Sequence, residues 1–590
     1  MRRIVICAVV MGLLAGVSYG VDYSFVGSEV DQSYDWDNVN IWNPTLLPPG
    51  TTGDSYTIAA GAQAETINLP TSGTGNTRYF GDLTITSGTL SGRNVGSDMT
   101  FRFVADNGHS GSLTGSGSAT DITMWNTANR YSTFDLDGDL DVPSLRSGSL
   151  YDGRRLQLVL RGSNNFVKWG TGASGNYGMH NATVKSGATY DFQQTDANKN
   201  FGMLDTGQFV VESGGTATGA IEVFMKDVSK TLSMDGAGDT TGLDVHYKHN
   251  YKSTDPVITS GGQLPGRAYH DVSFDAIKTG ASWVSSRTVY ITGGDLTVHG
   301  SLYLPIGPGT INSKSGAAWL LDTADNGTGA GRDIMVHGDM YLGKSNKNFP
   351  SPLSGIEGGL KANDSTVTVK GDLILGGNNV NYTYNAGGYI IGDTATFNIG
   401  GDYTVTLITD SKAKHDMGTS TVVFDGAGVG NAQVIASKYY PFYNVTINNP
   451  GGAVSLGGSA DDNLLIHGDL QILAAASFNT NGRVVTFNGP GHLLNDEVGV
   501  TFDNVELLAD AVVDLGSDIT ITKLMMGAGS EMYLLGHTLY ADGETYSGEG
   551  TWSNDDGTIY GGVIPEPGTL LLLGTGVLGV LGYVRRRRMR

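Results

Sequence analysis

The stretch Phe134-Asp-Leu-Asp-Gly-Asp-Leu-Asp-Val142 decides the fold of this chain. Apolar residues or glycine alternate with aspartate throughout it, so one side of an extended backbone is apolar and the other is acidic. This period of two is typical of a β-strand that buries one face in a core and turns the other to water. The glycine that precedes Asp139 indicates a turn or bulge where the chain bends from one strand into the next.

The Gly-Asp element of this stretch recurs along the chain, each time followed by a short alternating strand. Seven copies are present: Gly81-Asp82, Gly138-Asp139, Gly294-Asp295, Gly338-Asp339, Gly371-Asp372, Gly401-Asp402 and Gly468-Asp469. A larger unit, in which a glycine-rich turn precedes a short strand, recurs in the same order from Met234, Phe424 and Phe487. Its variable spacing is what loop insertions on a stacked scaffold produce.

Short strands repeated in this way predict an all-β fold, a right-handed parallel β-helix or solenoid over residues 21–560. Coils of roughly 20–30 residues would pair edge to edge and leave open edges only at the two ends. The alternative is a string of antiparallel β-sandwich domains with hairpin connections. That alternative predicts domain-sized periods of about 100 residues separated by linkers, and no clear linker stands out in the sequence.

The composition fits a secreted protein built from many strands and tight turns, because 88 of 590 residues are glycine and 39% are hydrophobic. The two ends hold seven of the 36 basic residues and one of the 58 acidic residues. The formal net charge of the body is therefore near −28. Nucleic acid is therefore not an expected partner, since phosphate binding needs a basic face. The single cysteine, Cys7, lies in the first 20 residues, so the body has no disulfide and no thiolate zinc site.

Both ends carry targeting segments. Arg2 and Arg3 precede an apolar run, and small residues follow it, so residues 1–20 are predicted to be a signal helix cleaved after Gly20. Residues 561–590 are predicted to be a sorting and anchor segment, with a transmembrane helix over 568–584 and a basic tail over 585–590. The apolar run is at the short end of what spans a bilayer, and its arginines favour a cytoplasmic C-terminus with the body outside.

The C-terminal segment resembles the PEP-CTERM sorting signal of Gram-negative bacterial surface proteins. A triplet, an apolar run and a basic cluster match in order, and the matching polar positions are Pro565, Glu566, Pro567, Arg585, Arg586, Arg587 and Arg588. The resemblance implies that an exosortase-type membrane enzyme recognises the tail and cleaves near the triplet, so that the mature protein loses its transmembrane helix. A plain membrane anchor that is never processed is the alternative.

The same resemblance implies where the protein is located and what it associates with. The protein would be held transiently in the inner membrane with its body in the periplasm, and would then reach the cell surface or the medium. Association with exopolysaccharide or biofilm matrix, and hence with glycans, is implied as well.

The start of the body resembles autotransporter-type passenger repeats. Trp36-Asp-Asn-Val-Asn-Ile-Trp42 is followed by a proline turn at Pro48 and Pro49, and then by the strand-like Asp54-Ser-Tyr-Thr-Ile58. This resemblance implies a β-helical body, as the repeats do.

Two residue patterns suggest a metal. Asp135, Asp137 and Asp139 partly match the spacing of a calcium loop, but glycine stands at the fourth position instead of the sixth and no glutamate follows at the twelfth. The strand period explains the same aspartates more simply. A Val/Ile-His-Gly context is shared by three histidines, which form either a metal-binding column or, more simply, a repeated position that faces water: His299, His337 and His467.

We expect a structural or adhesin-like surface protein, without enzymatic activity or cofactor. A long solenoid offers many polar and aromatic side chains for weak, multivalent contacts with sugars. The alternative is a β-helical polysaccharide lyase or glycoside hydrolase. Glycoside hydrolysis needs paired carboxylates; Asp461-Asp462 is one adjacent pair, without a recognisable supporting cluster.

Overall fold

The computed structural model describes a large part of the chain, and all structural statements below concern that part: residues 22–25, 33–35, 42–43, 55–59, 66–68, 77–87, 89–95, 99–105, 109–115, 121–126, 131–142, 145–147, 155–169, 179–193, 201–225, 233–249, 262–274, 287–304, 319–325, 329–343, 358–376, 388–405, 415–426, 431–541, 546–548, 550–553 and 557–561. No helix among them is long and apolar enough to cross a bilayer. The predicted signal helix and the predicted transmembrane helix over 568–584 lie outside the described residues.

The chain forms two compact units. The first unit comprises residues 1–301 and 312–317, and the second comprises residues 302–311 and 318–590. The elements of both units are β-strands, β1 to β27 in the first and β28 to β54 in the second.

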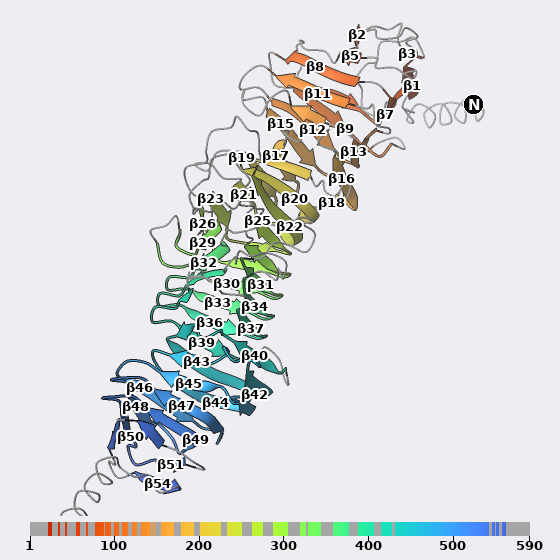
Figure 1. Ribbon diagram of the computed structural model, residues 1–590. Coiled ribbons are helices and arrows are strands. Elements are labelled where there is room, and N and C mark those ends of the chain that lie inside the picture. The colour runs from red at the N-terminus through yellow and green to blue at the C-terminus, as the bar shows by residue number, and fades with distance from the viewer. Residues whose placement is uncertain are drawn as a thin grey trace, which may run out of the picture. The chain divides into compact units, whose positions relative to one another are not determined.

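The first unit is built from parallel ladders in which a strand of one coil pairs with the equivalent strand of the next (Figure 1). One ladder contains β6 (Thr77–Phe80), β9 (Met99–Phe103), β12 (Tyr131–Leu136), β15 (Arg155–Leu160), β17 (Met179–Val184), β19 (Phe201–Val211) and β21 (Ser233–Asp235). A second contains β1 (Asp22–Phe25), β4 (Ser55–Ala59), β7 (Leu83–Ser87), β10 (Leu113–Gly115), β13 (Leu140–Val142), β16 (Asn165–Trp169), β18 (Thr189–Gln193), β20 (Thr216–Met225) and β22 (Asp239–His249).

A third ladder completes the earlier coils of this unit. It contains β2 (Ser33–Asp35), β5 (Thr66–Asn68), β8 (Thr89–Val95), β11 (Asp121–Asn126) and β14 (Leu145–Ser147). The later coils add three parallel pairs: β22 with β25 (Val272–Phe274), β23 (Gly262–Pro265) with β26 (Arg287–Thr292), and β24 (Ala268–Tyr269) with β27 (Leu296–Val298).

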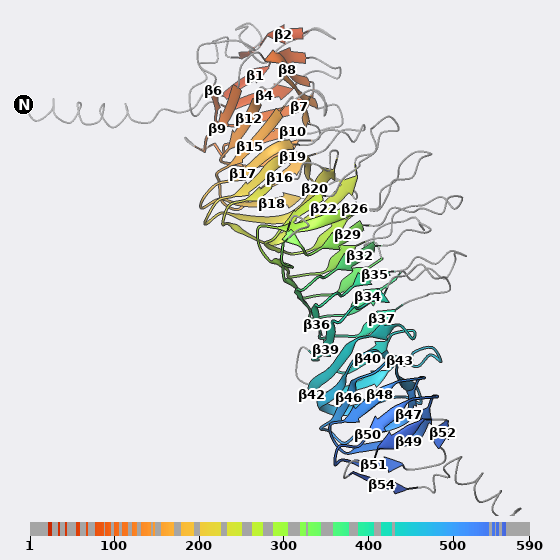
Figure 2. The same cartoon turned by 90° about the vertical axis from the view of Figure 1, so that its left-hand side faces the viewer.

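The second unit repeats this plan, and Figure 2 shows its ladders from another side. One ladder contains β30 (Ile334–Val336), β33 (Thr366–Val369), β36 (Thr396–Ile399), β39 (Thr421–Phe424), β42 (Asn444–Leu456), β44 (Leu470–Asn479), β46 (His492–Asp496), β48 (Val512–Leu515), β50 (Glu531–Tyr533) and β53 (Thr551–Ser553). A second contains β28 (Leu302–Leu304), β31 (Met340–Leu342), β34 (Leu373–Leu375), β37 (Tyr403–Val405) and β40 (Gln433–Ala436), and joins β42.

The third side of the second unit is formed in two stretches. The earlier stretch contains β29 (Trp319–Asp322), β32 (Gly358–Lys361), β35 (Gly388–Ile391) and β38 (His415–Asp416). The later stretch contains β41 (Pro441–Phe442), β43 (Leu464–Ile466), β45 (Val484–Phe487), β47 (Thr501–Leu507), β49 (Ile519–Met526), β51 (Thr538–Ala541) and β54 (Thr558–Gly561), with β52 (Tyr546–Gly548) beside β49. Thr368 and Asn398 are hydrogen-bonded across adjacent coils and lie 30 residues apart in the sequence. Thr486 and Glu506 form the same kind of contact and lie 20 residues apart.

The core consists of inward-facing side chains stacked in register from coil to coil. Phe134 pairs with Phe101 on one side and Leu158 on the other, and all three are buried. The rings of Phe101 and Phe134 lie 5.4 Å apart and stack. Leu136, Leu140 and Val142 are buried as well, so the predicted alternation is confirmed for these apolar positions. Asp135 breaks the pattern, because it is buried although it is charged.

Parallel pairing dominates the described strands, as the sequence predicts. The antiparallel exceptions among them are the pairing of β1 with β3 (Trp42–Asn43) and one isolated bridge between Ala324 and Gly331. The parallel sheets confirm an all-β solenoid of the β-helix class and contradict a string of sandwich domains with hairpin connections. The right-handed sense of the coil stays a prediction, one that agrees with the general handedness of parallel crossovers.

Candidate functional site

The repeated Gly-Asp elements form the corners between consecutive strands. In the second unit β36 ends at Ile399 and β37 begins at Tyr403, so Gly401 and Asp402 lie between them. In the first unit Gly138 and Asp139 likewise separate β12 from β13. The predicted bend at Gly-Asp is therefore confirmed.

The corner aspartates of the second unit form a chain of hydrogen bonds from coil to coil, which we call the corner ladder. It consists of Asp339, Asp372 and Asp402. The Asp339 carboxylate accepts the backbone N–H of Asp372 at 2.9 Å, and the Asp372 carboxylate accepts that of Asp402 at 2.8 Å. Asp402 in turn accepts the N–H of Val434 at 2.7 Å. The ladder satisfies N–H groups at corners, where the strand pairing is interrupted.

Burial and neighbouring charge act together on the ladder. Desolvation raises the pKa of the Asp402 carboxyl, and the negative charge of Asp372 raises it further, while the hydrogen bond from Val434 lowers it. A stack of like charges is thus kept in place by the backbone donors between them.

Two glycines of the Gly-Asp pairs, Gly371 and Gly401, make room for the aspartate of the preceding coil. A Cβ on Gly371 would lie 2.3 Å from Oδ1 of Asp339, and one on Gly401 would lie 2.3 Å from Oδ1 of Asp372. Neither glycine has a positive φ. Backbone freedom at a turn, which the sequence suggested, therefore does not explain these two glycines. They are required because a carboxylate approaches them closely.

Some corners carry a polar side chain where the ladder has glycine, and at three of them this side chain binds a backbone carbonyl oxygen of the preceding coil. Asn165, Gln433 and His492 each precede a residue whose N–H is accepted by an aspartate of the preceding coil. Their side chains bind corner carbonyl oxygens of that preceding coil. The distances are 2.8 Å from Asn165 to Asp137, 2.8 Å from Gln433 to Gly401, and 2.7 Å from His492 to Gly468.

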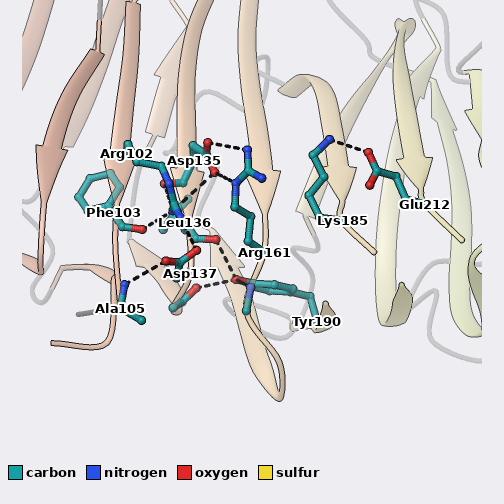
Figure 3. A network of polar contacts seen from close by, with 12 residues as sticks. Arg102, Phe103, Ala105, Asp135, Leu136, Asp137, Arg161, Lys185, Tyr190 and Glu212 are labelled. Atoms are coloured by element: carbon teal, nitrogen blue, oxygen red, sulfur yellow. Dashed lines mark hydrogen bonds and ion pairs between the residues drawn. The ribbon is translucent and has the colours of Figure 1, made fainter. Parts of the chain in front are cut away.

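Two of the three candidate calcium ligands, Asp135 and Asp137, lie beside two arginines of the first unit, in the network of Figure 3. The Arg161 guanidinium binds both carboxylate oxygens of Asp135, at 2.7 and 3.0 Å. Arg102 binds Asp137 at 2.6 Å, and its Nη1 lies 3.6 Å from Asp135. Asp139 lies at the corner and accepts the N–H of Phe166 at 2.9 Å. Calcium binding by the three aspartates stays a prediction, in which the ion would compete with these partners.

Tyr190 closes the same network from the inside of the coil. Its hydroxyl lies 3.0 Å from the carbonyl oxygen of Gly138 and 3.3 Å from that of Leu136, and it accepts the N–H of Gly162 at 3.2 Å. Burial raises the pKa of Tyr190 to about 12. The hydroxyl therefore stays protonated at neutral pH and acts as a structural donor.

The remaining candidates from the sequence are dispersed. Asp461 is exposed, whereas the adjacent Asp462 is buried, 3.2 Å from Nζ of Lys438, and accepts the N–H of Ser459 at 2.9 Å. This pair of aspartates thus has divergent surroundings. The three histidines of the Val/Ile-His-Gly context are all exposed, as expected for a position that faces water: His299, His337 and His467.

One group of metal-ligating side chains was missed by sequence reasoning. Asp244, His270 and Asp271 of the first unit place one potential ligand atom each within 4.8 Å of one another. The available signal was that His270-Asp271 precedes the short strand Val272–Phe274, as a Gly-Asp pair precedes other short strands.

The residues of the two predicted targeting segments lie outside the described residues. They include the cleavage position Gly20 and the sorting positions Pro565, Glu566, Pro567, Arg585, Arg586, Arg587 and Arg588.

Comparison with curated proteins and with solved structures found no match. A family model described as the PEP-CTERM protein-sorting motif matches residues 563–588. Signals of this kind direct export to the cell envelope and are processed by exosortase, a membrane enzyme. The chain therefore carries a PEP-CTERM sorting signal behind a β-rich, repetitive body.

Proposed function

We propose that the protein is a structural or adhesin-like component of the bacterial cell surface or extracellular matrix, associated with exopolysaccharide or biofilm. The observation that carries this proposal is the sorting motif at residues 563–588, because it assigns the body to the outside of the cytoplasm. Signal peptidase would remove residues 1–20, and exosortase would cut near Pro565-Glu566-Pro567. No enzymatic activity or cofactor is part of the proposal.

The corner ladder and the stacked core support a passive role for the body. Each coil depends mainly on its neighbours, so the scaffold presents repeated side chains over many coils. Such repetition converts weak individual contacts with sugars into firm attachment through multivalency. An acidic body near −28 would also keep an exported protein soluble.

The sorting part of the proposal is tested by cell fractionation. Cells that express the intact chain are compared with cells that express a chain truncated after Val563. We expect the intact chain in the membrane and then at the surface, and the truncated chain in the periplasm or medium without a membrane-held precursor. Identical distribution of the two chains would contradict the proposal.

The non-enzymatic part is tested with polysaccharides. The full chain is incubated with exopolysaccharide from the producing cells, and both binding and chain length are followed. Retention on the polysaccharide with unchanged chain length is expected. Shortened or unsaturated products would favour the alternative, a β-helical lyase or hydrolase.

A further inference from the structure

The corner formed by Asp244, His270 and Asp271 combines an imidazole with two carboxylates. Nδ1 of His270 lies 2.8 Å from Oδ1 of Asp244 and 3.8 Å from Oδ1 of Asp271. Asp244 belongs to β22, and the other two residues connect β24 to β25 on the next coil. Parallel pairing of β22 with β25 holds the two coils in register. The three side chains are thus brought together by the scaffold itself.

The backbone at this corner is the same as in the corner ladder. The Asp244 carboxylate accepts the N–H of Asp271 at 3.1 Å, and the Asp271 carboxylate accepts that of Ser301 at 2.6 Å. His270 therefore stands where the ladder has Gly371 or Gly401, with a side chain at a position that these glycines keep clear for a carboxylate.

The His270 imidazole lies near two carboxylates, whereas His109 and His537 at equivalent corners each lie near one, Asp82 at 3.3 Å and Asp518 at 3.9 Å. Asn165, Gln433 and His492 bind backbone carbonyl oxygens, whereas the imidazole of His270 lies against carboxylates. The His270 side chain is 53% exposed, and those of Asp244 and Asp271 are 30% and 26% exposed. A cation could reach the three ligand atoms from solvent and complete its coordination with water.

We propose that Asp244, His270 and Asp271 form a binding site for a divalent transition-metal ion of the zinc class. One imidazole nitrogen and two carboxylate oxygens are a ligand set that Zn²⁺ accepts, with water in the fourth position. Calcium prefers a shell of six to eight oxygen ligands, so an imidazole-containing corner discriminates against it. The body therefore holds a specific metal at one corner, besides any ions that gather loosely on its acidic surface.

Calorimetric titration of the full chain with ZnCl₂ tests the proposal. Physiological ionic strength, about 0.15 M, weakens loose binding to exposed charges. We expect saturable binding at the proposed site, and a loss of affinity of at least about tenfold in His270→Ala. His337→Ala is the matched control, because it removes another exposed corner histidine and should leave this binding unchanged. Equal affinity in the wild type and in His270→Ala would overturn the proposal.

A second variant separates metal binding from folding. Asp244→Asn keeps an acceptor for the N–H of Asp271 but removes a charged ligand. It should retain the wild-type melting temperature without metal and lose the rise in melting temperature that ZnCl₂ causes. CaCl₂ should cause no comparable rise in the wild type. A zinc-induced rise of the same size in Asp244→Asn, or an equal rise with calcium, would rule out the site.

Discussion

The carboxylate of Asp372 accepts the backbone N–H of Asp402 at 2.8 Å, across the junction of two coils. Gly401, the residue before Asp402, leaves the space that this carboxylate occupies. In the corner ladder the dipeptide thus encodes a contact between successive coils. The aspartate accepts an N–H of the following coil, and Gly371 and Gly401 leave room for the aspartate of the preceding coil. This relationship accounts for the glycine and the aspartate of the pairs Gly371-Asp372 and Gly401-Asp402.

Gly401→Ala should destabilise the second unit by about 1–3 kcal/mol, the usual cost of forcing extra atoms into a packed site. The added Cβ would lie 2.3 Å from Oδ1 of Asp372 and 2.6 Å from the backbone of Gly371, so relaxation requires the backbone to move. Urea denaturation followed by circular dichroism measures the change. Gly458→Ala is the control, because a Cβ there meets nothing within 4 Å, and its unfolding midpoint should change little.

Asp372→Ala should cost about 1–3 kcal/mol, because it leaves the N–H of Asp402 without its acceptor. Asp372→Asn should cost distinctly less, since the amide oxygen can still accept. The chain itself uses this solution at Asn444, whose side-chain oxygen accepts the N–H of Asp469 at 2.9 Å. Unfolding midpoints of the two variants provide the comparison, and an equal loss in both would show that charge, not acceptance of the N–H, is what matters.

Arg161→Ala should destabilise the first unit by about 1–3 kcal/mol. Removal of one partner of a fully buried ion pair costs about 3–5 kcal/mol, and the cost here is smaller because the Arg161 side chain is 42% exposed. Asp135, whose side chain is 10% exposed, would keep only its longer contact with Arg102. Thermal unfolding would measure the loss.

Lys185→Ala provides the matched control for that experiment. Lys185 and Glu212 form an ion pair on the same unit, but their side chains are 32% and 37% exposed. Exposed pairs contribute roughly 0–1 kcal/mol. A loss in Lys185→Ala as large as that in Arg161→Ala would contradict the importance assigned to burial of Asp135.

Acid should weaken the second unit through His415, whose burial lowers its pKa to about 4. The unfolded chain takes up a proton near the ordinary value of 6.5, whereas the folded chain resists protonation until about pH 4. The stability associated with neutral His415 is therefore present above pH 6.5 and is lost as the pH falls from 6.5 toward 4. The shift corresponds to about 3 kcal/mol over that window.

Replacement of His415 tests this pH dependence. The imidazole contacts the Tyr403 hydroxyl and packs edge-on against Phe442, at 5.4 Å between ring centres. His415→Phe should lower stability at pH 7, where the contact with Tyr403 is lost, and flatten the decline between pH 6.5 and 4. Urea midpoints of both proteins at several pH values in this range are the measurement. Parallel pH curves would exclude His415 as the source.

Much of the fold follows from local pattern in the sequence. The period of two around Phe134 predicts which apolar residues are buried, and the recurrence of Gly-Asp predicts short strands joined at bends. Both are local properties, and the structure confirms them. Parallel stacking also follows, because repeated short strands without linkers favour coils over separate domains.

Contacts between coils could not be derived in this way. The partner of Asp372 lies 30 residues along the chain and the partner of Asp402 lies 32 residues along it. Irregular spacing conceals such pairs until the register is known. For the same reason the burial of Asp135 between arginines and the meeting of Asp244 with His270 were not foreseen. The sorting segment could be recognised without knowledge of the strand register, because its parts are contiguous in the sequence.

Mass spectrometry of the protein recovered from the cell surface or medium tests the central claim most directly. We predict that peptides of the body, such as those within residues 431–541, are present, while peptides from residues 568–590 are missing. Deletion of the exosortase of the producing cell should restore the missing peptides in a membrane-bound form. Recovery of the tail in the surface or medium form, in the same ratio to the body with and without exosortase, would contradict the account.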